Sequence, residues 1–233
     1  MAGPTRYDGI AAWYDDEVRS GPAAGVTAVA VATTAELLGP GPGRCLDLGC
    51  GTGVALPTLT AQGWDVVGID VSLDQLRVAR ERVGPETELR QADAASLPFP
   101  DGTFDAVVAV LVHTDLDDVG AAYREAARVL RPGGRFVHVG THPCFCAPGV
   151  ERRDGSPHRL HAGYRARGWR EDGPGFGAGI RPRVGVNHVP LAGLLQAVLE
   201  AGIAVDAVVE PGDEDYPTLL AVAGWQRLAR MRD

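Results

Sequence analysis

Between residues 44 and 140, short apolar runs alternate with longer amphipathic stretches. The strand candidates in this region are RCLDLG, WDVVGID, TELRQAD, FDAVVAVLV and RFVHVG. The stretches between them, VALPTLTAQG, SLDQLRVARERVG and DDVGAAYREAARVL, have the apolar spacing of helices. Strands and helices that take turns in this way predict right-handed βαβ units on a parallel, doubly wound α/β sheet.

Local signals fix where several of these helices begin and end. Ser72 and Gln75 have the spacing of a capping box at a helix start, and Gly84-Pro85 stops the same helix. The sequence RPGG at 131–134 ends the next helix. Two more helices are predicted ahead of the sheet, at 7–19 and 24–38, and we expect them to cap its edge.

After the sheet, residues 143–187 are rich in glycine, proline and arginine and lack a regular apolar period. A stretch of this length is too long for an ordinary loop and is interpreted as a lid. A helix from Pro190 to Glu200 and a hairpin of IAVDAVVE and TLLAVAGW complete the chain. We therefore expect one domain over 1–233, with a helical cap (1–40), a core (41–141), a lid (142–188) and a C-terminal helix and hairpin (189–233).

Composition narrows the class of protein. The 233 residues are 45% hydrophobic, which is ample for a packed core, and the formal charge of −8 argues against affinity for a nucleic acid backbone. The first residues are acidic where a secretory signal is basic, and no run reaches the length of a membrane span. These features favour a cytoplasmic protein with reduced cysteines and with neither nucleic acid nor membrane as partner.

The motif with the clearest chemistry is CLDLGCGTG, in which an apolar strand runs into glycines at 49, 51 and 53. Glycines let the backbone turn sharply and approach a ligand closely, and the following helix start favours a negative group. Asp70 ends the next strand, where its carboxylate can accept hydrogen bonds from both ribose hydroxyls. A cofactor of the nucleotide type is predicted.

A dinucleotide site for an oxidoreductase is the first alternative. That site uses G-x-G-x-x-G, but position 54 is Val and the third glycine comes one residue early. Asp47 also lies in the strand before the turn, where a carboxylate suits a cationic ligand better than a pyrophosphate. S-adenosylmethionine carries a sulfonium and an ammonium group, so its charge matches this position.

Four motifs in order, LDLGCGTG, Asp70, QADAASLPFPDGTFDAVV and REAARVLRPGGRFVHVG, resemble the class I S-adenosylmethionine-dependent methyltransferases of the small-molecule "type 11" group. The resemblance covers residues 44–140, and YDGIAAWYD resembles the leading helix of that group. It implies S-adenosyl-L-methionine as cofactor and a Rossmann-like, seven-stranded, mostly parallel sheet of order 3-2-1-4-5-7-6 with strand 7 antiparallel.

The resemblance also implies roles for single residues. Gly49, Gly51 and Gly53 wrap the methionine moiety and Asp47 meets its ammonium group, directly or through water. Contacts to the rest of the cofactor are implied for Asp70 (ribose), Val71 (adenine face), Asp93 and Ala94 (adenine edge), Leu111 (sulfonium wall), Tyr7 and Tyr14 (carboxylate side). The alternatives are structural: a plain turn for the glycines, a helix cap for Asp70, a solvated turn for Asp93 and core packing for the tyrosines.

A methyl group on a sulfonium is already activated, so positioning and desolvation supply much of the catalysis. A hydroxyl acceptor also needs a base, for which histidine is suited. His113 and His142 follow the fourth and fifth strands at the ligand crevice, and His188 lies where the lid returns. These three are the catalytic candidates, whereas His138 inside its strand is expected to pack. Catalysis by proximity without a base is the alternative.

The acceptor is expected to be a small molecule, and O-methylation is favoured over N- or C-methylation. Eight arginines against four acids between 151 and 183 favour an anionic acceptor or a solvated face docked on an acidic body. Tyr164, Trp169 and Phe176 offer walls for an aromatic product of natural product biosynthesis. The chain is expected to act as a monomer or homodimer. A methyltransferase for RNA or protein and a non-transferring cofactor-binding protein are the competing functions.

The stretch THPCFCAPGVERRDGSPHRLH at 141–161 holds three histidines and two cysteines. Its C-x-C and H-x-x-H spacings do not match the C-x₂₋₄-C and H-x₃₋₅-H of structural zinc sites, so no metal is predicted. Its first half is expected to leave the fifth strand at the crevice, and its second half to begin the lid.

Overall fold

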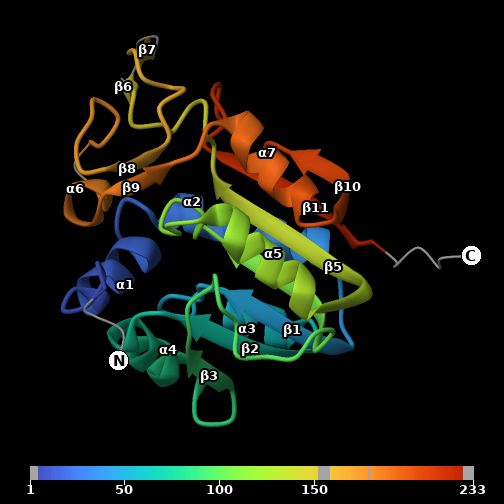
Figure 1. The fold of residues 1–233 in the computed structure, drawn as a ribbon. Coiled ribbons are helices and arrows are strands. Elements are labelled where there is room, and N and C mark those ends of the chain that lie inside the picture. Colours follow the sequence, from blue (N-terminus) through green and yellow to red (C-terminus); the bar gives the residue numbers. More distant parts are fainter. Residues whose placement is uncertain (1–4, 152–157, 178, 228–233) are drawn as a thin grey trace, which may run out of the picture.

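The computed structural model describes residues 5–151, 158–177 and 179–227 (Figure 1). Its centre is a seven-stranded sheet in the order β10-β11-β5-β4-β1-β2-β3, in which only β11 runs antiparallel to its neighbours. The strands are β1 (Gly43–Leu48), β2 (Trp64–Asp70), β3 (Glu88–Gln91), β4 (Phe104–Val110), β5 (Leu130–Thr141), β10 (Ile203–Val209) and β11 (Leu219–Gln226). With β10 and β11 as the sixth and seventh strands, the predicted order 3-2-1-4-5-7-6 is confirmed.

Helices cover both faces of this sheet because its strands carry apolar side chains on both sides. The helices are α1 (Ala11–Arg19), α2 (Ala24–Leu38), α3 (Leu56–Ala61), α4 (Leu73–Val83), α5 (Val119–Val129) and α7 (Leu191–Glu200). Alternate residues of β1 show the division: Leu46 and Leu48 join a core cluster with α5 and α7, while Cys45 joins a second cluster with α2, α3 and α4.

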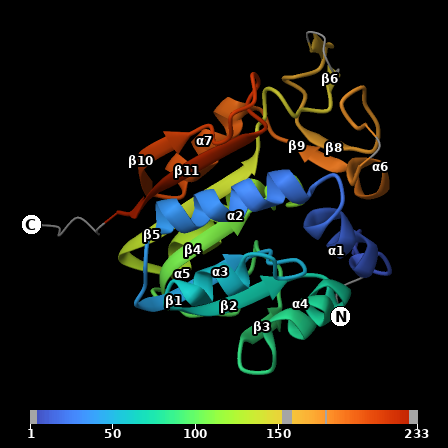
Figure 2. The same ribbon diagram turned by 180° about the vertical axis from the view of Figure 1, so that it is seen from behind.

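Two features differ from the predictions: the position of α2 and the start of β5. The helix α2 lies across the face of the sheet, against β4, β5 and β11, and does not cap an edge (Figure 2). Its composition explains this, because an almost wholly apolar helix is stabilised by burial against the sheet. The RPGG sequence at 131–134 belongs to β5, which starts at Leu130 opposite Phe104 and shifts register before Arg135.

The helix starts behave as their sequences indicate. Ser72 accepts a hydrogen bond from the Gln75 amide at 3.3 Å, although the Gln75 side chain makes no return bond among the described residues. Asp118 accepts one from the Ala121 amide at 2.9 Å. Ser72 lies directly behind the end of β2, whereas Asp118 follows the loop after β4, and each cap fixes where its helix begins.

The expected lid segment (142–188) contains only short elements: β6 (Val150–Glu151), β7 (Arg159–Leu160), β8 (Gly168–Arg170), α6 (Arg181–Val184) and β9 (Val186–His188). In both views its β8, β9 and α6 lie beside α1, at the carboxyl ends of β4 and β5 (Figures 1 and 2). Arg152, Arg153 and Asp154 of the arginine-rich stretch are outside the described residues, as are 1–4 and 228–233 of the outer parts.

Within the described residues, no single helix is long and apolar enough to cross a membrane. The helices α1 and α2 meet those criteria only as a pair, and they are bent by 78° at the break between them.

Candidate functional site

The glycine turn between β1 and α3 adopts a backbone that other residues rarely adopt. Gly49, Gly51 and Gly53 have φ angles of +74°, +54° and +77°. A Cβ on Gly49 would lie 2.3 Å from the Val112 side chain, whereas a Cβ on Gly51 would meet no atom closer than 3.6 Å. Gly49 is therefore required by packing, whereas the space beside Gly51 would accept a Cβ at ordinary contact distance from Gln75 and Tyr14.

Asp70 ties this turn to the end of β2. One of its oxygens accepts a hydrogen bond from the Gly51 amide at 3.0 Å, and the other accepts one from the Ser72 amide at 2.8 Å. Burial raises the pKa of the Asp70 carboxyl to about 6, although both amides act to lower it. Each oxygen keeps a lone pair that can accept a further hydrogen bond from a ligand hydroxyl.

Asp47 lies in β1 beneath the turn and is 1% exposed. Its Oδ1 atom has no hydrogen-bond partner among the described residues. Burial, and then the negative charge of Asp70, raise the pKa of the Asp47 carboxyl to about 7. A buried carboxylate without a counter-charge is costly, and a cationic group brought next to it would remove that cost.

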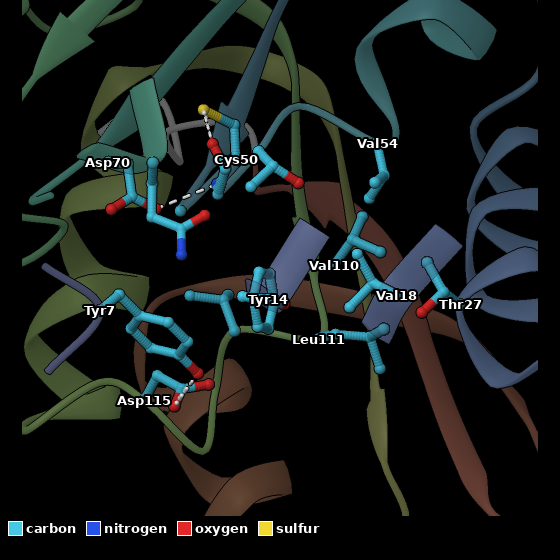
Figure 3. Close-up of a pocket in the computed structure, with 15 residues that line it drawn as sticks. Tyr7, Tyr14, Val18, Thr27, Cys50, Val54, Asp70, Val110, Leu111 and Asp115 are labelled. Atoms are coloured by element: carbon cyan, nitrogen blue, oxygen red, sulfur yellow. Dashed lines mark hydrogen bonds between the residues drawn. The ribbon is translucent and has the colours of Figure 1, made fainter. Parts of the chain in front are cut away.

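Two cavities meet at the glycine turn, and we call them the turn cavity and the Asp93 cavity. The turn cavity has a volume of about 60 Å³ and extends from Gly51 past Tyr14 to Leu111 (Figure 3). The Asp93 cavity has a volume of about 470 Å³ between Val71 and Leu116. Residues that line both cavities are Tyr7, Gly49, Asp70, Val112 and Asp115.

Most of the predicted cofactor residues line these cavities. The turn cavity is lined by Tyr7, Tyr14, Gly49, Gly51, Asp70 and Leu111. The Asp93 cavity is lined by Val71, Asp93 and Ala94. Gly53 and Asp47 lie behind the lining, and a Cβ on Gly53 would come within 3.1 Å of Ala79 and Leu56. The geometry thus brings together side chains from β1, β2, β4 and the N-terminal segment.

Tyr7 and Tyr14 stand edge to face, with ring centroids 5.1 Å apart. The Tyr7 hydroxyl donates a hydrogen bond to Asp115 Oδ1 at 2.9 Å. Burial raises the pKa of both phenols, so each is a neutral donor at neutral pH. Figure 3 shows the two rings and Asp115 on the side of the cavity that faces away from Val54.

The sequence analysis did not identify Asp115, although it follows the same strand as Leu111 and His113. Burial raises the pKa of its carboxyl, while Arg181, Tyr7 and Thr114 act to lower it. An acid within five residues of a parallel strand end is the signal that could have found it. Leu111 at that strand end has a φ of +56°, which is unusual for a residue with a Cβ.

The three candidate catalytic histidines lie together, but apart from the two cavities. His113, His142 and His188 line a third, much smaller cavity of about 10 Å³, with Thr114 and Asn187. The loop 111–115 separates this histidine cavity from the other two, since Leu111, Val112 and Asp115 line the turn cavity. No histidine lines the turn cavity or the Asp93 cavity among the described residues.

The hydrogen bonds of these histidines are largely used within the protein. His142 Nε2 lies 2.8 Å from Glu210, and its Nδ1 accepts a bond from the Cys144 amide at 3.1 Å. His188 Nε2 donates to the Tyr164 carbonyl at 2.7 Å. Only His113 keeps a buried nitrogen, Nδ1, without a partner among the described residues, and burial lowers its pKa well below the usual value.

The remaining histidines and cysteines of the 141–161 stretch do not gather around one point. His158 stacks on Tyr216 with centroids 4.4 Å apart, and His161 Nε2 lies 3.2 Å from Glu151. Cys144 Sγ is 3.4 Å from the Tyr164 hydroxyl, and Cys146 Sγ donates to the Thr218 carbonyl at 3.4 Å. His138 packs inside β5, as expected, and its Nδ1 lies 2.9 Å from the Tyr123 hydroxyl.

The aromatic residues of the lid segment lie outside the cofactor cavities. Trp169 lies under the Arg6 guanidinium, Phe176 is buried, and Tyr164 contacts Cys144 and the Leu191 amide. An aromatic wall for an acceptor is therefore not assembled from these three side chains in this conformation.

The comparisons with known proteins agree with this geometry. A family model described as "Methyltransferase domain" matches residues 46–138. Over 102 residues the chain is 45% identical to a phosphatidylethanolamine N-methyltransferase of Cereibacter sphaeroides, covering 42% of this chain and 50% of that protein. Over 105 residues it is 42% identical to a demethylmenaquinone methyltransferase of Corynebacterium kroppenstedtii, covering 45% and 44%.

Solved structures extend the likeness beyond the matched segment. An S-adenosylmethionine-dependent methyltransferase from Mesorhizobium loti is 27% identical, with a TM-score of 0.69 over 84% of this chain and 95% of that one. The [4+2]-cyclase SpnF is also 27% identical, with a TM-score of 0.54 over 77% and 57%. The chain spans about half the length of the curated relatives it matches. Residues 46–138 thus match the methyltransferase domain family in sequence, and most of the chain has the fold of S-adenosylmethionine-dependent methyltransferases.

Proposed function

We propose that the protein transfers the methyl group of S-adenosylmethionine to a small molecule. The observation that carries the proposal is the buried, unpartnered Asp47 carboxylate beneath a turn whose Gly51 lines the turn cavity. A cation fits that carboxylate, and the ligand with a cation, a ribose and an adenine fits the order of groups in the two cavities. When bound, the cofactor supplies a methyl group on a positively charged sulfur.

The residues of this chain have separate tasks in such a site. Asp70 accepts hydrogen bonds from the ribose, while Val71, Asp93 and Ala94 hold the adenine in the Asp93 cavity. Gly51 allows close approach in the turn cavity, and Tyr7 and Tyr14 cover it and exclude water. Water exclusion strengthens each of these electrostatic contacts.

An oxygen atom is the acceptor that we propose to test first. The carboxylate of Asp115 lines both cavities and can accept a proton from a hydroxyl held there. A histidine base remains a prediction for His113, His142 and His188, and it requires the loop 111–115 to open toward the turn cavity. The names of the two curated relatives concern a nitrogen acceptor and a quinone, so nitrogen and carbon acceptors belong in the same test.

The test is incubation with methyl-labelled cofactor and a panel of phenols, alcohols, amines, quinols, RNA and protein. We expect label in a small molecule, and we expect Asp115→Asn to reduce turnover by about a hundredfold if that carboxylate takes the proton. His142→Ala and His113→Ala serve as matched variants, because a histidine base predicts that one of them causes this loss. Transfer to RNA or protein alone would contradict the proposal.

A cofactor-binding protein that performs another reaction is the second candidate. The 27% identity to a protein named as a [4+2]-cyclase favours keeping it in view. Tight cofactor binding without transfer to any acceptor class would support this candidate. The formal charge of −8 weighs against an RNA methyltransferase, since clustered cations are needed to displace counterions.

We also propose that the protein works in the cytoplasm, as a monomer or homodimer. None of the four cysteines forms a disulfide within the described residues, which fits a reducing compartment. Cell fractionation and light scattering of the purified protein test these two statements.

A further inference from the structure

The lid segment (142–188) and the N-terminal segment (5–19) hold each other by reciprocal contacts. Arg6 of the N-terminal segment stacks on Trp169 of the lid, 3.5 Å from its ring centroid. Arg183 of the lid stacks on Trp13 of α1, 3.9 Å from its ring centroid. Each segment thus supplies one guanidinium and one indole, an attractive pairing of charge with an aromatic face. The N-terminal segment also carries both tyrosines of the turn cavity.

A third contact runs from the lid to the loop that follows β4. Arg181, the first residue of α6, donates a hydrogen bond to the Thr114 hydroxyl at 2.7 Å, and its guanidinium lies 3.7 Å from Asp115 Oδ1. The backbone amide of Asn187 in β9 donates a hydrogen bond to the Thr114 carbonyl of the same loop at 2.7 Å. The lid therefore contacts Thr114 and Asp115 of this loop from two of its elements, α6 and β9.

Asp115 stands between the lid and the N-terminal segment. Its Oδ1 atom accepts a hydrogen bond from the Tyr7 hydroxyl at 2.9 Å. The same oxygen is the one that lies 3.7 Å from the Arg181 guanidinium. The charge of Arg6 and a hydrogen bond from Thr114 also lower the pKa of this carboxyl. Its negative charge in turn raises the pKa of Asp70 and of Tyr14. The chain of contacts from Arg181 through Asp115 to Tyr7 joins three segments that are far apart in sequence.

We propose that Arg181 is a positioning residue for the cofactor site. Docking of the lid brings its guanidinium to Asp115 and Thr114, Asp115 holds the Tyr7 hydroxyl at the wall shared by both cavities, and the site is complete only in this arrangement. The inference rests on the proposed function for the identity of the ligand, and it adds a link between lid docking and cofactor affinity. Arg181 lines neither the turn cavity nor the Asp93 cavity, and it acts through Asp115.

The sign of the pH effect follows from the charges around Asp115. Burial raises the pKa of this carboxyl and Arg181 lowers it, so removal of Arg181 moves the pKa further up. The carboxylate then becomes protonated at a higher pH, and the acid limb of ligand affinity moves in the same direction. A merely structural change in the lid would weaken binding equally at every pH.

The experiment uses Arg181→Leu, Arg181→Lys and the control Arg165→Leu in the full chain. Arg165 is an exposed lid arginine with no ion pair among the described residues. The probe is S-adenosylhomocysteine, measured by calorimetry from pH 5.5 to 8.5, because it lacks the sulfonium charge and reports positioning rather than attraction to the altered field. We expect Arg181→Leu to weaken binding about tenfold, the effect of one lost hydrogen bond, with its acid limb at higher pH. Lysine restores most of the affinity, and the control does not change it.

Hydrogen exchange of the ligand-free variants supplies an independent readout. Arg181→Leu is expected to speed exchange in residues 5–10 and 111–118, and Thr114→Ala is expected to act in the same direction. Unchanged exchange in these segments, or a uniform loss of affinity that lysine does not rescue, would overturn the inference. If the wild-type protein binds no S-adenosylhomocysteine, the proposed function fails, and the exchange measurement still decides whether Arg181 positions Asp115 and Tyr7.

Discussion

Asp47 is a single carboxylate on an otherwise apolar strand face, and its isolation decides its chemistry. A protonated Asp47 has no charge to offer a cation, so cofactor affinity depends on the state of this group. Because its pKa is about 7, Asp47 gains or loses its charge close to neutral pH. The carboxyl is ionised above that pH, so if it holds the ammonium group as proposed, affinity is expected to be lost as the pH falls through it.

We expect Asp47→Asn to weaken S-adenosylmethionine binding roughly tenfold to a hundredfold at pH 8, the range of a hydrogen bond to a charged group. Calorimetry between pH 5.5 and 8.5 checks this, and the variant should lose the part of the acid limb near pH 7. Asp70→Asn is the comparison variant: it removes the charge that helps to raise the pKa of Asp47, so its acid limb should remain but move to lower pH. Equal pH profiles for wild type and Asp47→Asn would contradict the assignment.

Two glycines of one turn predict different failures. Gly49→Ala drives a Cβ into Val112 and is expected to lower the free energy of unfolding by about 2 kcal/mol or more. Gly51→Ala makes only ordinary van der Waals contacts, so its positive φ costs about 1 kcal/mol, but the methyl group narrows the turn cavity. Urea unfolding and cofactor calorimetry on both variants separate the effects. A stable Gly51→Ala protein with unchanged affinity would show that the ligand lies elsewhere.

At the scale of elements, β5 and α5 are joined by a buried polar contact between His138 and Tyr123. Burial lowers the pKa of His138 to about 4, and that of His113 also falls. Because the unfolded chain takes up a proton near pH 6.5 and the folded one does not, stability is lost as the pH falls from 6.5 toward 4. His138 alone contributes on the order of 3 kcal/mol to this loss.

The acid loss of stability can be assigned by a paired substitution. Tyr123→Phe with His138→Leu removes both polar partners, so we expect near wild-type stability at pH 8 and a smaller decrease between pH 6.5 and 4.5. Urea unfolding at several pH values measures it. His161→Gln, on an exposed histidine beside Glu151, is the control and should keep the full decrease. If the double variant and wild type lose stability equally, other groups cause the effect.

The sequence predicts most elements because each has a local signal. The strand RCLDLG ends in glycines that must turn, and Ser72 caps α4 through its own side chain. The position of α2 was wrong because an apolar helix has no polar face from which its orientation can be inferred. Asp115 and Arg181 were missed for a different reason: their contact spans 66 positions and leaves no local pattern. The histidines were expected at the ligand crevice, but they line a separate cavity, because the turn of loop 111–115 could not be inferred from strand order.

At the scale of the whole molecule, cofactor binding is expected to raise the thermal stability of the protein. A ligand that binds only the folded chain at a hundred times its Kd adds about 2.7 kcal/mol. For a domain of this size that corresponds to a rise in Tm of roughly 5 to 10 °C. We expect S-adenosylhomocysteine to give this shift in scanning fluorimetry, and adenosine alone to give a smaller one. Asp70→Asn should remove most of the shift, and an equal shift in that variant would exclude a role for the ribose contact.

Leu111 has a further consequence for how this protein responds to selection. Its left-handed backbone at the end of β4 costs about 1 to 2 kcal/mol for a residue with a Cβ, yet its side chain lines the turn cavity. Glycine would relieve the backbone and delete the wall. A library screened only for heat resistance is therefore expected to enrich glycine at position 111, and a library screened for product is expected to return leucine or a residue of similar bulk. Opposite outcomes of the two screens would show that backbone stability and the shape of the turn cavity favour different residues at position 111.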